Sequence, residues 1–213
     1  MIVLTATIQL KDGETYEIDK RNMLSLETNI IDRADISLPS WGIISNSGSL
    51  RFVDYNGDIR EYAEQLRLTD NIEVRVWLKN TTSKSEKEIA HFFTSQWDYD
   101  SNNYNVNVTI NDNLEEWQDI NIDGFSYDAR ETEAKNLKYF YEYLYSKTPL
   151  HYNMIDFSDL DKKTQYVLEN TSVKYPLLKK GTLWQQWEKL AVASQSHIFY
   201  QYNKTVFVYN EAD

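Results

Sequence analysis

The three histidines are the first side chains to test for chemistry, because imidazole is a common general base and zinc ligand. His91, His151 and His197 share no motif, and none has a second histidine four residues away, as a helical zinc site would need. Cysteine is absent, which removes thiolate metal sites and cysteine nucleophiles. His91 and His197 lie beside aromatic residues in strand-like segments, so we expect both to be satisfied inside a sheet.

Two clusters of alternating acidic and amide residues have a spacing that calcium could use. They are Asp54, Asn56 and Asp58, and Asp98, Asp100 and Asn102. Neither is followed by a glutamate at the twelfth loop position, and the second lacks the central glycine, so both fail as EF-hands. We interpret the first as a turn with a helix cap and the second as a turn.

The chain also lacks the glycine-rich phosphate loops and the G-x-S-x-G nucleophile motif. Adjacent carboxylates such as Glu115 and Glu116 are too ordinary in an acidic protein to indicate a glycosidase. The sequence therefore predicts no enzyme, with no catalytic, cofactor-binding or metal-binding residue and no cofactor.

Composition narrows the class of protein further. The 213 residues include 16 Tyr and 6 Trp, and 41% are hydrophobic, which indicates an ordered chain with a proper core. The net charge of −11 weighs against a nucleic-acid partner, because phosphate neutralisation requires clustered Lys and Arg. There is neither an 18-residue apolar run nor a basic-apolar leader. We expect a soluble protein made without a signal, with no sequence-specific nucleic-acid binding and no membrane insertion.

Residues 1–112 read as mostly β-structure. Apolar and polar residues alternate in a series of short segments, which is the pattern of half-buried strands. The expected strands are Ile2–Leu10, Glu14–Ile18, Met23–Thr28, Asp32–Leu38, Ser49–Asp54, Ile72–Leu78, Ile89–Trp97 and Tyr104–Ile110. One short helix is expected over Asp58–Leu66, with Asp58 as its cap. The number and spacing of strands predict a small antiparallel β-barrel or sandwich.

Residues 113–213 read as a second, helix-rich domain, which makes the fold class α+β. Helices are expected at Leu114–Trp117, at 131–147, from Ser158 to near Asn170, and at 182–191. Thr182 and Gln185 form a capping box at the start of the last helix. Aromatic and β-branched residues then alternate on both sides of Asn203-Lys204, which predicts a β-hairpin over 197–209.

Aromatic side chains surround the helix expected at 131–147. One face of a helix can bury only about half of such a ring of side chains in its own core. Tyr139, Tyr143 and Tyr145 are therefore candidates for an interface with another subunit.

Two segments together resemble the hub and tail-associated proteins of phage tails and baseplates. The first runs through Ile36–Trp41 and Ile44–Asp54 to Asn56-Gly57, and it contains the run Ser47-Gly48-Ser49-Leu50-Arg51-Phe52-Val53-Asp54. The second is the helix and aromatic hairpin over 182–209. The resemblance covers about half of the chain and leaves residues 112–180 unassigned. The richness in Asn, Lys, Ile and Tyr fits the AT-rich genome of a phage or prophage of a low-GC Gram-positive host.

The resemblance implies a structural subunit of a tail tip or baseplate, located in the virion and made in the host cytoplasm. Such a subunit assembles as a homo-oligomeric ring or hub that joins the tail tube to host-recognition parts. Its partners are other tail proteins: tail tube, tape measure, fibre or lysin subunits. Hub, distal tail ring and peripheral baseplate component all remain open. In a channel component, Asp98 and Asp100 are the candidates to face the lumen and repel DNA phosphates.

Two other functions remain open at this point. One is a receptor- or carbohydrate-binding baseplate module that uses exposed aromatic rings as stacking platforms. A cluster of such rings in one concave groove would favour it. The other is a hydrolase, which would need a histidine and a carboxylate to converge in a pocket, for example around His151.

Overall fold

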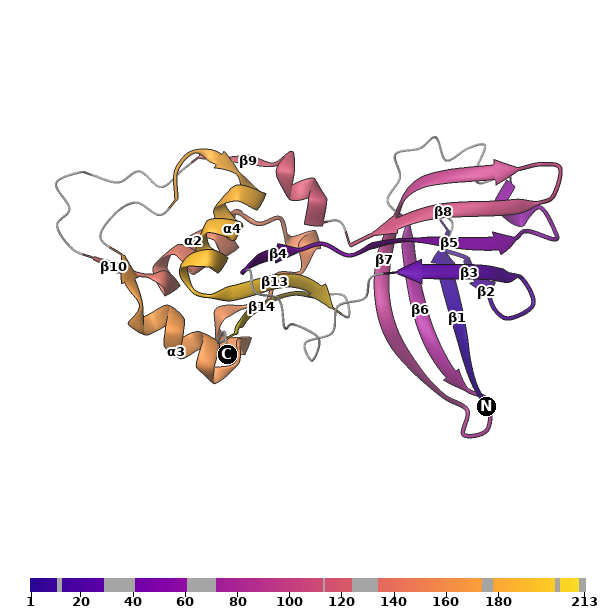
Figure 1. The fold of residues 1–213 in the computed structure, drawn as a ribbon, viewed down its shortest axis with the longest axis horizontal. Coiled ribbons are helices and arrows are strands. Elements are labelled where there is room, and N and C mark those ends of the chain that lie inside the picture. Colours follow the sequence, from indigo (N-terminus) through magenta and orange to yellow (C-terminus); the bar gives the residue numbers. More distant parts are fainter. Residues whose placement is uncertain are drawn as a thin grey trace. The chain divides into compact units, whose positions relative to one another are not determined.

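The structure is a computed structural model that describes residues 1–10, 13–28, 41–60, 72–112, 114–123, 134–173, 178–201 and 204–210. The chain divides into two compact units (Figure 1). Unit 1 contains Met1–Ile30 and Asn46–Asp112, and unit 2 contains Ile31–Ser45 and Asn113–Asp213. The expected boundary at residue 112 lies at one passage between the units. We expected one continuous domain over 1–112, whereas Ile31–Ser45 belongs to unit 2.

Unit 1 is built on one antiparallel sheet. Its strands are β1 (Ile2–Gln9), β2 (Thr15–Ile18), β3 (Met23–Thr28), β5 (Ser47–Val53), β6 (Glu73–Asn80), β7 (Ser85–Asp100) and β8 (Asn105–Asn111). Their order in the sheet is β2-β1-β6-β7-β8-β5-β3. The expected antiparallel β-structure is confirmed, but the two edges, β2 and β3, do not pair with each other, so the described strands form one open sheet and no closed barrel. The strand expected at Asp32–Leu38 lies outside the described residues.

The long strand β7 bends the sheet around its core. Its first half pairs with β6 and its second half with β8, and the two partners meet at Phe93. The register shifts between Val76 and Trp77, and again between Thr94 and Gln96. Each such bulge inserts an unpaired residue and bends the strand. One sheet can therefore enclose a core without closing into a barrel.

The core of unit 1 follows the period-2 pattern of its strands. Every second residue is buried, including Ala6 and Ile8, Leu50 and Phe52, Val74 and Val76, and Val106, Val108 and Ile110. Burying one such side chain contributes about 1.5–3 kcal/mol relative to leaving it in water. The intervening residues face outward, and they carry most of the polar groups discussed below.

The two hairpin turns at the ends of β7 have the same construction. In the turn from β6, the Asn80 side chain accepts hydrogen bonds from the amides of Thr82 (3.0 Å) and Ser83 (3.2 Å), and Lys84 has φ 55°. In the turn into β8, Asp100 accepts from the Asn102 amide at 2.9 Å, and the residue four places after it, Tyr104, has φ 56°. An Asx side chain thus opens each turn, and a left-handed residue closes it.

A short helical turn follows β5, and its cap differs from the expected one. Residues 58–60 are helical, and the rest of the helix expected over Asp58–Leu66 lies outside the described residues. The buried carboxylate of Asp54 accepts hydrogen bonds from the amides of Ile59 (3.1 Å) and Arg60 (3.2 Å). Asp58, the expected cap, instead accepts a hydrogen bond from Asn56. The interpretation of Asp54–Asp58 as a turn with a helix cap is confirmed, with the role moved to Asp54.

Unit 2 combines short helices with small sheets. Its helices are α2 (Leu137–Lys147), α3 (Lys162–Asn170) and α4 (Leu183–Ala193), with 3-10 turns η2 (Leu114–Gln118), η3 (Leu150–Tyr152) and η4 (Phe157–Asp159). Two-residue strands pair as β10 (Lys135–Asn136) with β11 (Ser172–Val173), and β12 (Gly181–Thr182) with β9 (Asn121–Ile122). The helix expected from residue 131 begins only at Leu137, because Asn136 caps it by accepting from the Tyr139 amide. The capping box of Thr182 and Gln185 on α4 is confirmed.

A three-stranded sheet brings the two sequence segments of unit 2 together. β13 (Ser196–Gln201) pairs antiparallel with β14 (Lys204–Tyr209) and parallel with β4 (Gly42–Ile44). The sequence does not predict β4, because this strand has only three residues and its partner lies far along the chain. Parallel pairing of this kind leaves no local turn signal.

Aromatic rings fill the core of unit 2. Tyr141 lies edge-on to both Trp187 and Phe207 at 5.3 Å between ring centroids, and Trp117 stacks on Trp187 at 6.2 Å. The indole N–H of Trp187 donates to the Thr148 hydroxyl at 2.9 Å. Helices α2 and α4 are thus joined to the sheet through a few large side chains.

A buried carboxylate joins the residue at which the chain re-enters unit 1, Asn46, to the residue at which it finally leaves, Asp112. Oδ2 of Asp112 accepts hydrogen bonds from the backbone N of Asn46 at 2.6 Å and from its side-chain amide at 3.2 Å. The Asp112 amide in turn donates to the Asn46 carbonyl at 3.0 Å. Both residues are buried; Asn46 is the first residue of the second segment of unit 1, and Asp112 is its last.

Candidate functional site: a polar groove in unit 1

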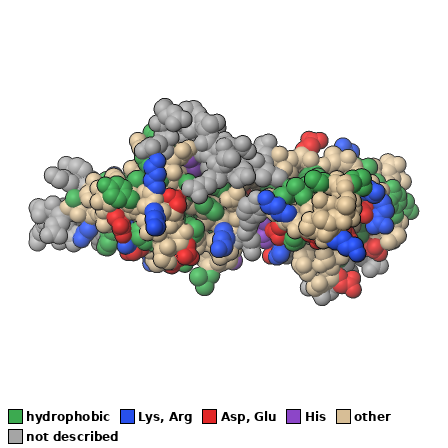
Figure 2. All heavy atoms as spheres, turned by 90° about the horizontal axis from the view of Figure 1, so that it is seen from below, with side chains coloured by type: hydrophobic (Ala, Val, Ile, Leu, Met, Phe, Trp, Pro, Cys, Tyr) green, Lys and Arg blue, Asp and Glu red, His purple; other side chains and the backbone are tan. Residues whose placement is uncertain are grey.

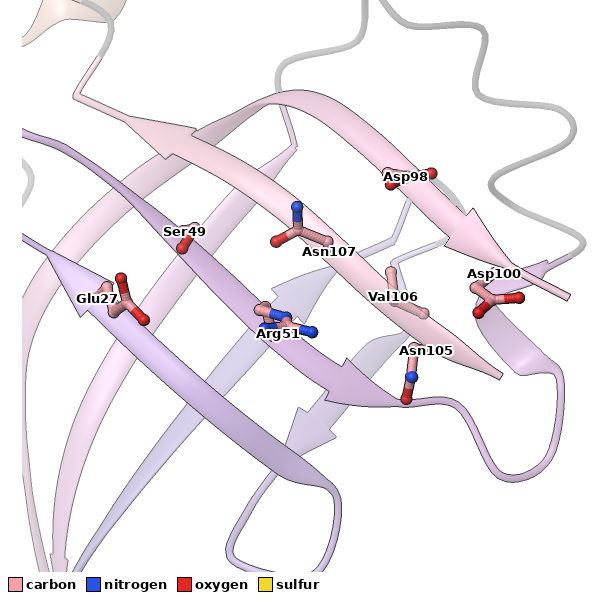
Figure 3. Close-up of a pocket in the computed structure, with 8 residues that line it drawn as sticks. All are labelled: Glu27, Ser49, Arg51, Asp98, Asp100, Asn105, Val106 and Asn107. Atoms are coloured by element: carbon pink, nitrogen blue, oxygen red, sulfur yellow. The ribbon is translucent and has the colours of Figure 1, made fainter. Parts of the chain in front are cut away.

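A groove of about 440 Å³ runs across the outward face of strands β3, β5, β8 and β7 (Figure 3). Its polar lining consists of Glu27, Ser49, Arg51, Asp98, Asp100, Asn105 and Asn107. The strand registers align these residues, because Arg51 lies opposite Asn107, which lies opposite Asp98, and Asn105 lies opposite Asp100. Alternate residues of the same strands, such as Leu50 and Val108, face the core. The polar side chains therefore point to the outside.

Most charged side chains in this groove contact no partner within the described part of the chain. The side chains of Glu27, Arg51 and Asp98 form no hydrogen bond or ion pair among the described residues. With Asp100 the groove holds three carboxylates and one guanidinium, so its formal charge is −2. Donors and acceptors that the fold leaves unfilled suit the recognition of a charged or polar partner.

Asp98 and Asp100, expected to act alike, have different surroundings. Both are exposed on β7 and both line the groove. The carboxylate of Asp100 accepts from the Asn103 side chain at 2.8 Å and from the Asn102 amide. These hydrogen bonds lower the pKa of Asp100, and the one from the Asn103 side chain has the largest effect. Asp100 is therefore also a turn residue, as the sequence indicated, whereas Asp98 is free to bind.

The three interface candidates on α2 do not share one environment. Tyr139 is 38% exposed and lies edge-on to Phe140. The Tyr143 hydroxyl donates to the Asp123 carbonyl at 2.7 Å, and Lys147 lies over its ring. Tyr145 is partly buried. Tyr141, also on α2, is fully buried, so unit 2 absorbs part of the aromatic surplus that suggested an interface.

The three histidines lie in separate places. His91 on β7 is buried against Phe93, with its Nε2 at 3.7 Å from a Glu73 carboxylate oxygen. His151 is exposed, and its ring lies 4.1 Å from that of Tyr152. No group of three or more acidic or histidine side chains in the described ranges could hold a metal ion.

His197 corrects one expectation. It lies on β13 and is fully buried, but neither ring nitrogen has a hydrogen-bond partner among the described residues. Desolvation by burial lowers the pKa of His197, so the neutral ring is favoured. The sequence predicted a satisfied sheet histidine, and the missing partners could not be seen from local pattern.

A second groove of about 370 Å³ lies at the turns after β2 and β5. Its lining includes Tyr16, Asp19, Arg21, Tyr55 and Asn56. The Tyr55 side chain is 68% exposed. Burial, and next the nearby Asp54 carboxylate, raise the pKa of Tyr16 to about 12, so its hydroxyl remains protonated. No histidine lines either groove.

The viewed face of the molecule carries dispersed charge, with Lys and Arg side chains interspersed among Asp and Glu (Figure 2).

Within the described ranges, no helix has the length and apolar character needed to cross a membrane. The first part of the segment that suggested a tail protein, residues 36–40, lies outside those ranges.

Comparison with known proteins gives a likeness in fold. No family model matches the chain, and no curated protein matches it in sequence. The tail protein from Neisseria meningitidis MC58 superimposes with a TM-score of 0.51 and 8% identity, over 95% of this chain and 50% of that chain. A chain of the virion of a native gene transfer agent particle gives a TM-score of 0.36 and 13% identity, over 52% of this chain and 40% of that one.

The second of these scores is too low to carry an argument, and the first shows fold alone. This chain spans half or less of the length of either protein. The conclusion from the comparisons is that both units together, over nearly the whole chain, share the fold of a protein described as a tail protein.

Proposed function

We propose that this protein is a structural subunit of a phage tail or phage-like particle. The observation that carries the proposal is the likeness in fold to a tail protein over 95% of the chain. Because that likeness extends across both units, it concerns their combination and not one common domain. The resemblance of Ser47–Asp54 to the phage hub proteins points in the same direction independently.

The role proposed in the particle is a hub or ring at the tail tip or baseplate. Copies of the chain associate and join the tail tube to host-recognition parts, in a phage or prophage of a low-GC Gram-positive host. The role is non-catalytic. The unused polar groups of the groove in unit 1 support a protein that works through contacts.

In a channel component, the groove strands provide a surface that DNA phosphates would avoid. Asp98 and Asp100 add negative charge there, although Arg51 offsets part of it. At physiological salt the screening length is about 8 Å, so only charges that line the lumen act on passing DNA. We therefore propose these two aspartates as lumen-facing residues.

The experiment is to locate the protein in particles. Particles purified from an induced lysogen are analysed by mass spectrometry and by immunogold electron microscopy with an antibody against this chain. We expect label at one end of the tail, and a stop codon early in the gene should yield heads without functional tails. Normal, infectious particles that lack the protein would reject the proposal. Muralytic activity of the purified chain that is lost in His151→Ala would reject the non-catalytic role.

The second groove favours one alternative, a carbohydrate-binding module. The exposed ring of Tyr55 lies in a concave surface beside Tyr16, Asp19 and Asn56, which is an arrangement suited to a sugar ring. Binding of host-wall polysaccharide is measured by calorimetry for the native chain and Tyr55→Ala. Binding that Tyr55→Ala abolishes supports this function, whereas the exposed Tyr166→Ala in unit 2 serves as the matched control.

A further inference from the structure

The tip of the β6–β7 hairpin carries two lysine side chains that form no ion pair within the described part of the chain. Lys84 closes the turn and Lys87 follows on β7, and both are exposed. Neither has an ion pair or hydrogen bond within the described part of the chain. Lys79 on the same hairpin differs, because its ammonium contacts Glu17 at 2.6 Å and Glu86 at 3.5 Å. Lys84 and Lys87 are therefore cations available to a partner.

The polar groove described above presents the opposite charge. The Glu27 and Asp98 carboxylates lie on either side of Arg51, and all three lack a partner among the described residues (Figure 3). A cation that enters this groove meets two carboxylates, but it also meets the guanidinium. With Asp100 the groove has a formal charge of −2, so it still attracts a partner that carries cations.

One copy of the chain cannot bring these two surfaces together. The tip begins β7, and Asp98 lies near the other end of this 16-residue strand. A straight strand of that length spans about 50 Å at ~3.3 Å per residue, and β7 is bent by two bulges, at Glu88–Ala90 and at Thr94–Gln96. The β6–β7 tip and the β7–β8 turn project in different directions from unit 1 (Figure 1). The complementary surface must come from another molecule.

We propose that the occupant of the groove is the β6–β7 hairpin tip of a second copy of this chain. Lys84 and Lys87 of one copy face Glu27 and Asp98 of the next. The two surfaces differ, so the contact is head-to-tail, and its repetition generates a ring or an open helix. The inference rests on the proposed function and deepens it, because it names the surfaces by which copies associate; it places Asp98 in that contact and leaves Asp100 as the lumen-facing residue.

The contact is sensitive to salt and weak in isolation. Its charged groups lie at the surface, where screening is strong and individual ion pairs contribute little. Association therefore requires low ionic strength or a template that raises the local concentration of copies.

Introduced cysteines give a direct test, because the chain contains none. Full-length protein with both Lys84→Cys and Asp98→Cys is oxidised at low ionic strength and high concentration and run on a non-reducing gel. We expect a ladder of disulfide-linked oligomers that collapses on reduction. Each single variant can form dimers at most. The control pair Lys20→Cys with Asp98→Cys uses an exposed lysine away from the tip and should give no ladder. A missing ladder, or one equal to the control's, would overturn the proposal.

Charge reversal tests the same contact without covalent bonds. Asp98→Lys and Lys84→Glu alone should each weaken self-association at least about tenfold, measured by sedimentation velocity, because each juxtaposes like charges. A mixture of the two variants should associate again, because the unchanged tip of Asp98→Lys meets the unchanged groove of Lys84→Glu, and the reversed tip of Lys84→Glu meets the reversed groove of Asp98→Lys; oligomers in which the two variants alternate are expected. Self-association that neither reversal changes would reject the inference and leave the groove to another partner. Because both tests use purified chain, they can succeed even if the chain is absent from tail particles.

Discussion

The two units of this protein solve the problem of a small core in different ways. Unit 1 distributes burial over many aliphatic residues of one long sheet, in which Leu50, Val76 and Val108 are each one of a series. Unit 2 has short elements, and it concentrates burial in a few large rings around Trp187. The core of unit 1 should tolerate the loss of one side chain better than the core of unit 2, because each side chain contributes a smaller share of the buried apolar surface.

The largest effect is expected from Trp187→Ala. The change removes a fully buried ring that contacts Trp117, Tyr141 and Phe207, and it should lower the unfolding free energy of unit 2 by about 3–5 kcal/mol. Denaturant titration with hydrogen-exchange mass spectrometry assigns the loss to a unit. The matched control is Trp184→Ala on the same helix, where the side chain is only partly buried.

A single truncation in the distributed core should cost less. Ile110→Val in unit 1 is expected to lower stability by about 0.5–1.5 kcal/mol, detected in the same titration. An equal or larger loss than for Trp187→Ala would remove the distinction between the two cores.

The next effect tests the link between the two passages of the chain. Asp112→Ala leaves the backbone and side-chain amides of Asn46 without their carboxylate acceptor. We expect a loss of about 2–3 kcal/mol, because buried donors are costly to leave unpaired. Exchange should rise at residues near 46 and 112 first. Asp112→Asn keeps one amide oxygen and should recover part of the stability, and equal losses in both variants would argue against the role of the carboxylate.

Acid should lower the stability of unit 2, and a variant without the buried His197 should lose part of this pH dependence. The pKa of His197 is lowered in the folded protein, so the unfolded chain binds the proton more readily. Stability is therefore full above pH 6.5, the ordinary value, and falls as the pH drops below it. The slope contributed by one group is at most about 1.4 kcal/mol per pH unit. Replacement by phenylalanine should remove this part of the pH dependence between pH 7 and 5. An unchanged pH profile would contradict it.

An effect as small as that of Ile110→Val is expected at the start of α4. Thr182 accepts a hydrogen bond from the Gln185 amide at 3.2 Å, and Thr182→Ala should cost about 1 kcal/mol. Thr182→Ser retains the hydroxyl and is the control. Thermal unfolding followed by circular dichroism measures both, and identical midpoints for the two variants would show that the cap contributes nothing.

Local pattern predicted those parts of the fold that local physics determines. The strands with period-2 burial and the capping box of α4 were expected from neighbouring residues alone. The pattern does not predict β4, and it favours Asp58 as the cap in place of Asp54, because the burial of Asp54 and its hydrogen bond from the Tyr16 hydroxyl involve residues far along the chain.

The candidate site was predictable only in part for a similar reason. Asp98 and Asp100 were identified from their own segment. Glu27 and Arg51 join them only through the pairing of β3, β5, β8 and β7, which connects residues far apart in the chain. The available signal was the alternation Ser49, Arg51, Val53 against the buried Leu50 and Phe52. This alternation indicates which side chains of β5 face outward, but it does not indicate which strands pair with β5.

The parallel strand β4 has a consequence for synthesis of the chain. Gly42–Ile44 leaves the ribosome long before its partner β13, roughly 150 residues later, and translation at about 5–20 residues per second makes that an interval of some ten to thirty seconds. Strands β5 to β8 emerge during this interval, so unit 1 can fold while β4 waits with its backbone groups unpaired. The order of translation thus makes the sheet of unit 2 the last part of the molecule to form, and it exposes the nascent β4 edge to chaperones or to a neighbouring chain.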